Sequence, residues 1–120
     1  PDSFADISIA AADWDYIIEA MENVVHDPRG TARAVGHGAK YHMAGKTGTS
    51  QVYTIQQDET ALKTDELPYH LRDHALFVAF APTEAPAVVA VVVIEHGGGG
   101  SSVAAPIARQ VIDGYLELKN

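Results

Sequence analysis

One short segment of this sequence limits the possible folds more than any other. Residues 88–94 read Val-Val-Ala-Val-Val-Val-Ile, an unbroken apolar run in which almost every residue is β-branched. Such residues favour strands, and a strand that is apolar at every position must have both of its faces covered. We therefore expect a strand over residues 87–95 that lies in the centre of a sheet and not at its edge.

Two further strands are expected before it. Residues 73–81 are rich in apolar side chains such as Leu76 and Phe77, and residues 82–86, Pro-Thr-Glu-Ala-Pro, form a tight turn after them. This strand and the next should therefore pair as an antiparallel hairpin. Residues 42–53 are rich in Thr, Val and Tyr and predict the first strand of the chain.

A helix is expected on each side of the strands in the sequence. The first contains apolar residues at helical spacing, with acidic residues between them that face water: Trp14, Ile17, Ile18, Met21, Val24 and Val25. Pro28 and Gly30 end this helix, and residues 31–41 should form a loop or short turn. The chain is thus expected to have an α+β fold.

The second helix is expected after the glycine run at residues 97–100. Ser101 or Ser102 should cap it, and Pro106 lies in its first turn, where proline is tolerated. Two sets of residues recur at four-residue spacing, each on its own face: Val103, Ile107, Val111 and Tyr115 on one, and Arg109, Asp113 and Glu117 on another.

The composition excludes several classes of protein. The 120 residues include 16 acidic and 8 basic side chains and no cysteine, which gives a formal net charge of −8. This acidic balance argues against a nucleic-acid partner, because such a protein normally carries a basic surface. The lack of cysteine excludes a disulfide framework and a zinc ribbon. The longest apolar run is about half as long as a membrane-spanning helix requires.

The most informative short motif reads Gly-Lys-Thr-Gly-Thr-Ser over residues 45–50. One interpretation, a phosphate-binding P-loop, fails because Lys40 stands where its first glycine should be and because a strand, not a helix, is expected after it. The other interpretation is the Lys-Thr-Gly strand of serine acyl-transferases. Lys46 would then attract a substrate carboxylate, the hydroxyls of Thr47 and Thr49 would hydrogen-bond it, and Gly48 would leave space for a ligand. Taken alone, these three letters fit an ordinary strand with a solvent-facing lysine better.

The motif does not stand alone. Five segments follow one another in order: 30–32 (Gly-Thr-Ala), 44–51 (Ala-Gly-Lys-Thr-Gly-Thr-Ser-Gln), 74–82 (His-Ala-Leu-Phe-Val-Ala-Phe-Ala-Pro), 95–102 (Glu-His, four glycines and two serines) and 105–108 (Ala-Pro-Ile-Ala). Together they resemble the C-terminal part of the transpeptidase domain of class B penicillin-binding proteins, most of all the elongation-type members of Gram-negative bacteria. The resemblance covers nearly the whole chain.

The resemblance implies a D,D-transpeptidase that cross-links peptidoglycan stem peptides by serine acyl transfer, is acylated by β-lactams and uses no cofactor or metal. Lys46, Thr47 and Gly48 would be the third motif of the family. The hydroxyls of Thr47 and Thr49 would hold the carboxylate of the substrate or antibiotic, and the backbone N–H of Thr49 would be one of two oxyanion-hole donors.

The resemblance also implies part of a penicillin-binding protein and β-lactamase-like sheet, with three antiparallel strands flanked by an N-terminal and a C-terminal helix. It further implies work at the periplasmic face of the bacterial inner membrane, with an N-terminal membrane anchor that this chain does not contain.

The first two motifs of the family, S-x-x-K and Ser-x-Asn, are absent. None of the five serines has lysine three residues later or asparagine two residues later: Ser3, Ser8, Ser50, Ser101 and Ser102. We therefore expect residues 1–120 to be a C-terminal fragment of the domain that has no nucleophile and no activity alone. It would require the missing N-terminal part. Its strand at residues 87–95 would have an open edge, and the fragment should either self-associate through this strand or rearrange to cover it.

Other interpretations carry less weight. His96 and the glycines after it match the oxyanion loop of lipases, but no G-x-S-x-G nucleophile motif follows, and a flexible exit into the last helix is preferred. His70 and His74 have the spacing of a helical zinc motif, but Leu71 replaces its glutamate and Pro68 argues against a helix. A non-catalytic binding or structural α+β module with a coincidental Lys-Thr-Gly match remains the alternative.

Overall fold

The fold was analysed in a computed structural model, which describes residues 8–52, 63 and 66–118. Three strands form one sheet: β1 (Ala44–Ser50), β2 (His74–Ala81) and β3 (Val88–Ile94). Their order is β1-β2-β3, and both neighbouring pairs are antiparallel. The three predicted strands and the hairpin of β2 and β3 are confirmed, each strand being slightly shorter than expected. The connection between β1 and β2 lies partly outside the described residues and contains the short 3-10 helix η1 (Tyr69–Leu71).

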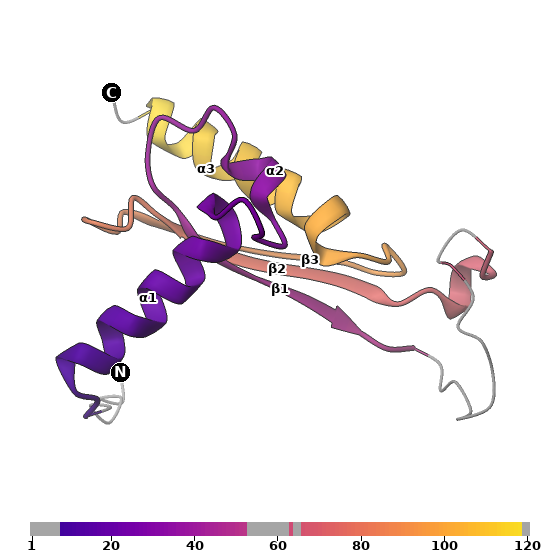
Figure 1. The fold of residues 1–120 in the computed structure, drawn as a ribbon. Helices are drawn as coiled ribbons and strands as arrows, with labels where there is room; N and C mark the ends of the chain where they lie inside the picture. Colours follow the sequence, from indigo (N-terminus) through magenta and orange to yellow (C-terminus); the bar gives the residue numbers. More distant parts are fainter. Residues whose placement is uncertain (1–7, 53–62, 64–65, 119–120) are drawn as a thin grey trace, which may run out of the picture.

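One face of the sheet is covered by the C-terminal helix (Figure 1). The chain leaves β3, forms the π-helical turn η2 (Gly100–Ala104) and continues as α3 (Ala105–Leu118). Small residues on α3 allow it to lie close to the sheet, where they pack with larger apolar side chains. The resulting core includes Phe77, Ala79, Ala90, Ala104, Ala108 and Ile112.

The face of α3 that packs on the sheet is centred on Ala108 and Ile112, and of the apolar set at four-residue spacing Val103 packs against the core while Ile107 and Val111 do not. Ile107 is 38% exposed and Val111 is 52% exposed, whereas Ala108 and Ile112 are fully buried. The chain enters α3 from η2, which lies against β2 and β1, and this entry fixes the rotation of the helix about its axis. Neither predicted serine cap forms a side-chain cap: the hydroxyl of Ser102 donates to the carbonyl of Gly99 instead.

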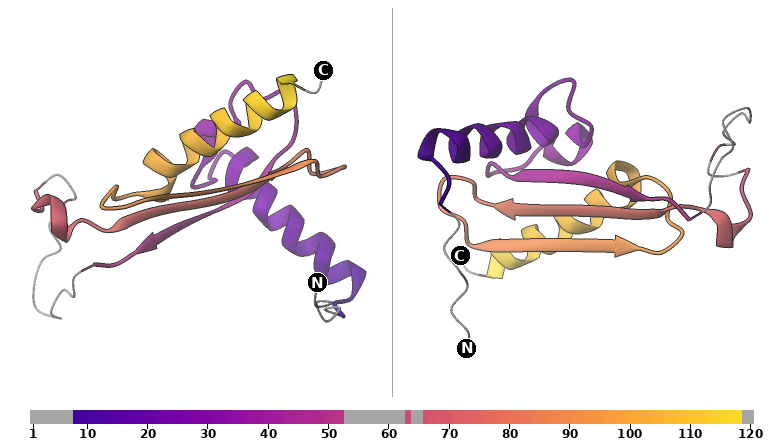
Figure 2. Two further views of the ribbon diagram at one scale, coloured as in Figure 1. Left: turned by 180° about the vertical axis from the view of Figure 1, so that it is seen from behind. Right: turned by 90° about the horizontal axis from the view of Figure 1, so that it is seen from below.

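The opposite face of β2 and β3 is uncovered among the described residues. Figure 2 shows this face in its right-hand view, with α3 behind the strands. Val89, Val91 and Val93 all point to it and are 65%, 70% and 55% exposed. The expectation that β3 is a central strand with both faces covered is therefore wrong for the chain as described. Here β3 is an edge strand, because no strand beyond it is present in the described parts of the chain.

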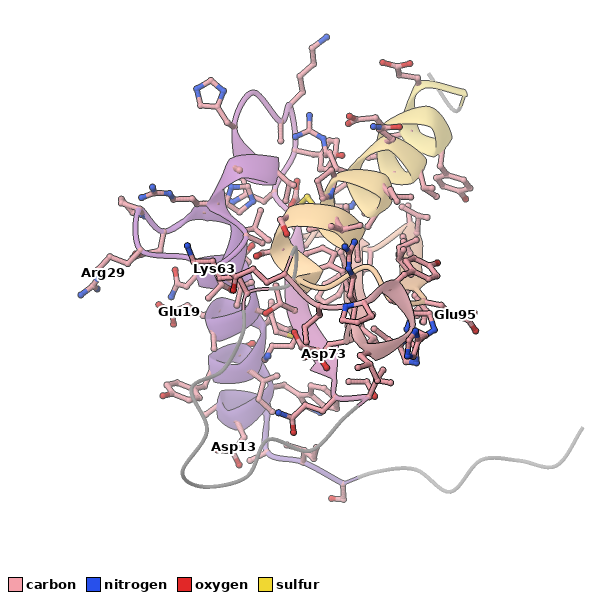
Figure 3. All side chains as sticks on the ribbon, turned by 90° about the vertical axis from the view of Figure 1, so that its right-hand side faces the viewer. Asp13, Glu19, Arg29, Lys63, Asp73 and Glu95 are labelled. Atoms are coloured by element: carbon pink, nitrogen blue, oxygen red, sulfur yellow. The ribbon has the colours of Figure 1, made fainter. Side chains whose placement is uncertain are left out.

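The N-terminal helix α1 (Ala11–His26) lies beside the sheet and projects away from it (Figure 1). Only its C-terminal end packs against β1, and Val25 is its one buried residue. Trp14 and Ile17, which belong to the predicted apolar stripe, are exposed. The expected water-facing acids agree with the structure, since Asp13 and Glu19 point outward in Figure 3. A short helix, α2 (Arg33–Gly36), lies in the segment expected to be a loop or short turn.

Candidate active-site strand

The Lys-Thr-Gly motif lies in the middle of β1, at an edge of the sheet. Among the described residues, β1 pairs only with β2, so its other edge has unpaired backbone N–H and C=O groups. Lys46 and Thr49 are exposed, and Thr47 and Gly48 are half-buried. An exposed strand edge of this kind can accept an extended peptide through main-chain hydrogen bonds, with neighbouring side chains adding specificity.

The predicted site residues divide between the two faces of β1. Lys46 and Gly48 share the uncovered face, because they pair with Val78 and Leu76 of β2. Thr47 and Thr49 pair with Phe77 and Ala75 and share the face that carries η2 and α3. The Lys46 ammonium and the two hydroxyls therefore lie on opposite faces of β1. They can contact the same ligand only if that ligand lies along the free edge of the strand. In this structure Nζ of Lys46 donates to the backbone carbonyl of Thr47 at 2.7 Å.

A glycine at position 45 is required by the core beneath the strand. A Cβ atom placed on Gly45 would lie 2.6 Å from Cζ of Phe77, a side chain that is 1% exposed. Gly48 is less restricted, since its Cβ would lie 3.2 Å from Cβ of Leu76. The glycine before the lysine therefore serves packing, whereas the glycine after the threonine keeps the uncovered face beside Lys46 free of a side chain.

A hydrogen-bonded cluster supports the end of β1 near Ser50. The carboxylate of Asp73, labelled in Figure 3, accepts from the backbone N–H of Val52 at 3.1 Å. His74 begins β2 opposite Ser50, and its Nδ1 accepts from the backbone N–H of His96 at 2.9 Å. His96 itself has a positive φ of 55°. The contact between His74 and His96 was not predicted from the sequence, because only the fold brings these two residues together.

The start of β1 is fixed to α1 by a second histidine. Nε2 of His26 accepts a hydrogen bond from the backbone N–H of Met43 at 3.1 Å, and the His26 ring stacks on that of His42 with centroids 4.9 Å apart. Burial, and then electrostatic interaction with the neighbouring His42, lower the pKa of His26. His26 therefore favours its neutral form, which is the form that can accept from Met43.

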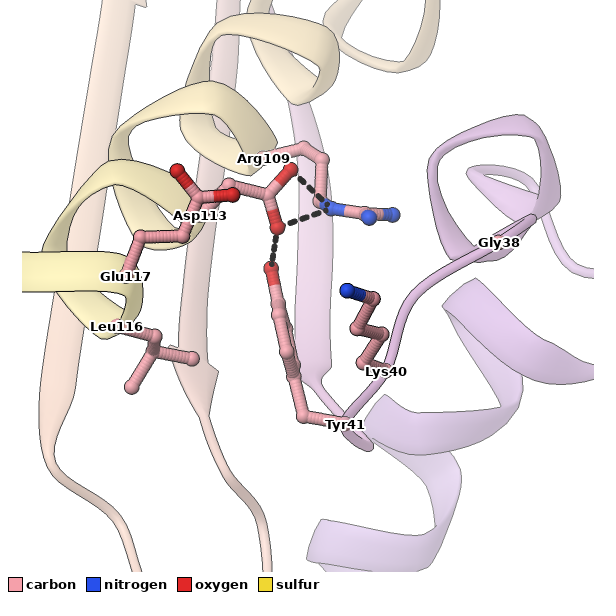
Figure 4. Close-up of a pocket in the computed structure, with 7 residues that line it drawn as sticks. All are labelled: Gly38, Lys40, Tyr41, Arg109, Asp113, Leu116 and Glu117. Carbon is pink, nitrogen blue, oxygen red and sulfur yellow. Dashed lines mark hydrogen bonds and ion pairs between the residues drawn. The ribbon is translucent and has the colours of Figure 1, made fainter. Parts of the chain in front are cut away.

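The loop before β1 is fixed to α3 beside a hollow of about 220 Å³ (Figure 4). The hydroxyl of Tyr41 donates to the carboxylate of Asp113 at 2.7 Å, and Nε of Arg109 donates to the same carboxylate at 2.8 Å. Burial works to raise the pKa of Asp113, but these hydrogen bonds outweigh it and hold the pKa below its ordinary value. Burial, together with the bond to Asp113, raises the pKa of Tyr41. This network serves to position β1, because its residues lie at the opposite end of the strand from Thr49.

Three further observations concern metal sites and membrane spans in the described part of the chain. No group of three or more His, Cys, Asp or Glu side chains in it could hold a metal ion. The His70 and His74 pair does not form a helical zinc motif, since η1 ends at Leu71 and His74 is in β2. No helix in the described part is long and apolar enough to cross a membrane.

Comparison with known proteins identifies clear relatives. The family described as penicillin binding protein transpeptidase domain matches residues 2–113. The peptidoglycan D,D-transpeptidase MrdA of Haemophilus influenzae is 45% identical over 105 residues, which are 88% of this chain and 16% of that protein. The chain thus spans about a sixth of the length of this curated relative.

Solved structures agree with the sequence comparison. The crystal structure of Pseudomonas aeruginosa PBP2 in complex with WCK 5153 is 43% identical, with a TM-score of 0.78 over 97% of this chain and 22% of that one. Penicillin-binding protein A of M. tuberculosis, solved as a penicillin G acyl-enzyme complex, is 31% identical, with a TM-score of 0.56 over 85% of this chain and 20% of that one. The predicted α+β fold and the resemblance stated from the sequence are confirmed.

Proposed function

Since this chain belongs to the family of penicillin-binding protein transpeptidase domains, we propose that it is part of a peptidoglycan D,D-transpeptidase. Such an enzyme cross-links stem peptides by serine acyl transfer and is acylated by β-lactams. The observation that carries the proposal is the position of residues 46–49 on an exposed edge strand, within the segment that matches the family. The alternative, an unrelated binding or structural module, has no observation in its favour.

The proposed role of β1 is to bind the acyl donor. Lys46 and the hydroxyls of Thr47 and Thr49 attract and hold the carboxylate of a stem peptide or of a β-lactam. The free edge of β1 supports this role, because an extended peptide can lie along it while its carboxylate meets these side chains. The backbone N–H of Thr49 stabilises the developing oxyanion, and loss of one such donor typically costs about 10²–10³ in rate.

The nucleophile is proposed to come from another part of the same protein. None of the serines in this chain lies in an S-x-x-K motif, so Ser50 is not assigned that role despite its place in β1. The uncovered apolar face with Val89, Val91 and Val93 is the surface against which the missing part of the domain would pack. By analogy with the family, the protein works at the periplasmic face of the inner membrane.

Labelling with a fluorescent penicillin tests this function. We expect a covalent adduct on the full-length protein that contains these residues and none on the 120-residue chain alone. Replacing Lys46 by alanine in the full-length protein should lower the labelling rate by about 10²-fold, because the carboxylate loses its positive partner.

Lys40 provides a matched control for the Lys46 variant, since it is an exposed lysine in the loop before β1. Lys40→Ala should label at the wild-type rate. A covalent adduct on the isolated chain would contradict the absence of a nucleophile, and normal labelling of Lys46→Ala would contradict the role assigned to β1.

A further inference from the structure

The glycine run after β3 rests directly on the Lys-Thr-Gly strand. A Cβ atom placed on Gly100 would lie 2.6 Å from the carbonyl oxygen and 3.2 Å from the nitrogen of Gly48, and closer still to the carbonyl oxygen of Leu76. These are all backbone atoms, so no side-chain rotation could relieve the contact. Gly100 is buried, and it is the first residue of η2. The sequence motif alone gives no reason for a glycine at this position.

The segment around Gly100 is held in place on both sides. Before it, the backbone N–H of Gly98 donates to the carbonyl of Asp73 at 2.8 Å, and that of His96 donates to His74 at 2.9 Å. After it, η2 leads into the buried residues Ala104 and Ala105. A larger residue at position 100 therefore could not be accommodated by lifting the loop away from the sheet.

Of the two strands that contact Gly100, β1 is more easily displaced than β2. Among the described residues β2 is paired on both edges, whereas β1 is paired only with β2. An added methyl group at position 100 would therefore displace Gly48 more readily than Leu76. Because Thr49 follows Gly48 directly, its backbone N–H would move as well.

We propose that Gly100 is a positioning residue that sets the backbone of Gly48 and Thr49 for acyl transfer. The proposal rests on the proposed function, because it assigns to Gly100 the placement of the oxyanion donor on β1. Displacement of a catalytic group by about 1 Å can cost about 10²-fold in rate. In the protein that folds, the expected defect thus lies in bond formation more than in ligand capture.

The test compares single glycine variants of the full-length protein. Gly100→Ala should lower the acylation rate constant at saturating fluorescent penicillin by about 10²-fold. The penicillin concentration that gives half-saturation should change much less, since Lys46 remains. Gly99→Ala is the matched control in the same run, because its Cβ would meet only the hydroxyl of Ser102, at 2.9 Å, which can rotate away.

The outcomes separate this inference from the proposed function. No labelling of the wild-type protein would overturn both. A folded Gly100→Ala protein that acylates at the wild-type rate would overturn the positioning role alone. The positioning role would also be overturned if Gly100→Ala only reduced the amount of folded protein. In that case the labelled fraction falls in proportion to the folded fraction, and the folded protein acylates at the wild-type rate, which indicates a purely structural role.

A second variant keeps the inference testable if Gly100→Ala does not fold. His74→Ala removes the acceptor for the N–H of His96 and loosens the segment that presses on Gly48. We expect the acylation rate constant to fall by about tenfold or less, with little change in half-saturation. His70→Ala, an exposed histidine of η1, is the control. Unchanged acylation by a folded His74→Ala protein would overturn the proposal.

Discussion

Gly45 shows at the scale of one residue how the core restricts the sequence of the candidate site. Its missing side chain makes room for the ring of Phe77, 2.6 Å from the position a Cβ would take. Gly45→Ala should lower the free energy of unfolding by about 1–3 kcal/mol, because the added methyl forces a buried ring from its position. Urea unfolding of the chain measures this difference.

Gly114 in α3 supplies the control for that experiment. A Cβ at Gly114 would meet nothing within 4 Å, and alanine favours a helix interior over glycine. Gly114→Ala should therefore raise stability by up to about 1 kcal/mol. Equal effects of the two variants would contradict the packing role given to Gly45.

At the same scale, the sequence identified the residues of β1 but not those that hold it. The strand that carries Lys46, Thr47 and Thr49 was predictable because it is a local pattern, and the roles of these residues remain predictions. The contact of Gly100 with Gly48 joins residues far apart in the chain and involves no side chain. No pattern of residue types reports such a contact, so it could be seen only in the folded chain.

At the scale of elements, the junction of α1 and β1 should respond to pH through His26. Its pKa is lowered in the folded chain by burial and then by His42, so the unfolded chain takes up the proton first. The stability that neutral His26 contributes is fully present above 6.5, the pKa of the unfolded chain's histidine. It falls as the pH drops from 6.5 through the lower pKa of His26 in the folded chain. Urea unfolding at about pH 7.5 and about pH 5.5 should show this loss.

Two variants isolate the contribution of His26. In His26→Gln, the side-chain oxygen can still accept from Met43 but does not titrate, so the variant should lose less stability over the same range. His37→Gln, at an exposed histidine, should retain the wild-type dependence on pH. If His26→Gln behaved like the wild type, another group would have to carry the effect.

Helices and strands were predictable from the sequence where a local pattern of residue types defines them. The strands followed from β-branched and aromatic runs, and α1 followed from helical periodicity. The packed face of α3 does not follow from apolarity, since Val111 is exposed whereas the close approach to the sheet buries the small Ala108. The short helix α2 was missed because its residues pack against α1 and α3, which local propensity does not report.

At the scale of the whole molecule, the apolar character of β3 was predictable but its surroundings were not. Val89, Val91 and Val93 point away from α3, and nothing among the described residues covers them. A strand that is apolar on both faces is normally buried on both. The exposed face and the free edge of β3 thus mark where this chain would pair with another.

We therefore expect the isolated 120-residue chain to associate with itself through β3. Val91→Lys should shift it toward the monomer, because a charge on an edge strand opposes both sheet pairing and burial of this face. Sedimentation velocity at several concentrations measures the shift, and Gln110→Lys, with the same change of charge at an exposed position of α3, should leave association unchanged. A wild-type chain that remains monomeric while the backbone amides of β3 exchange freely with solvent would contradict self-association through β3. Association of both variants to the wild-type extent would instead place the contact elsewhere on the molecule.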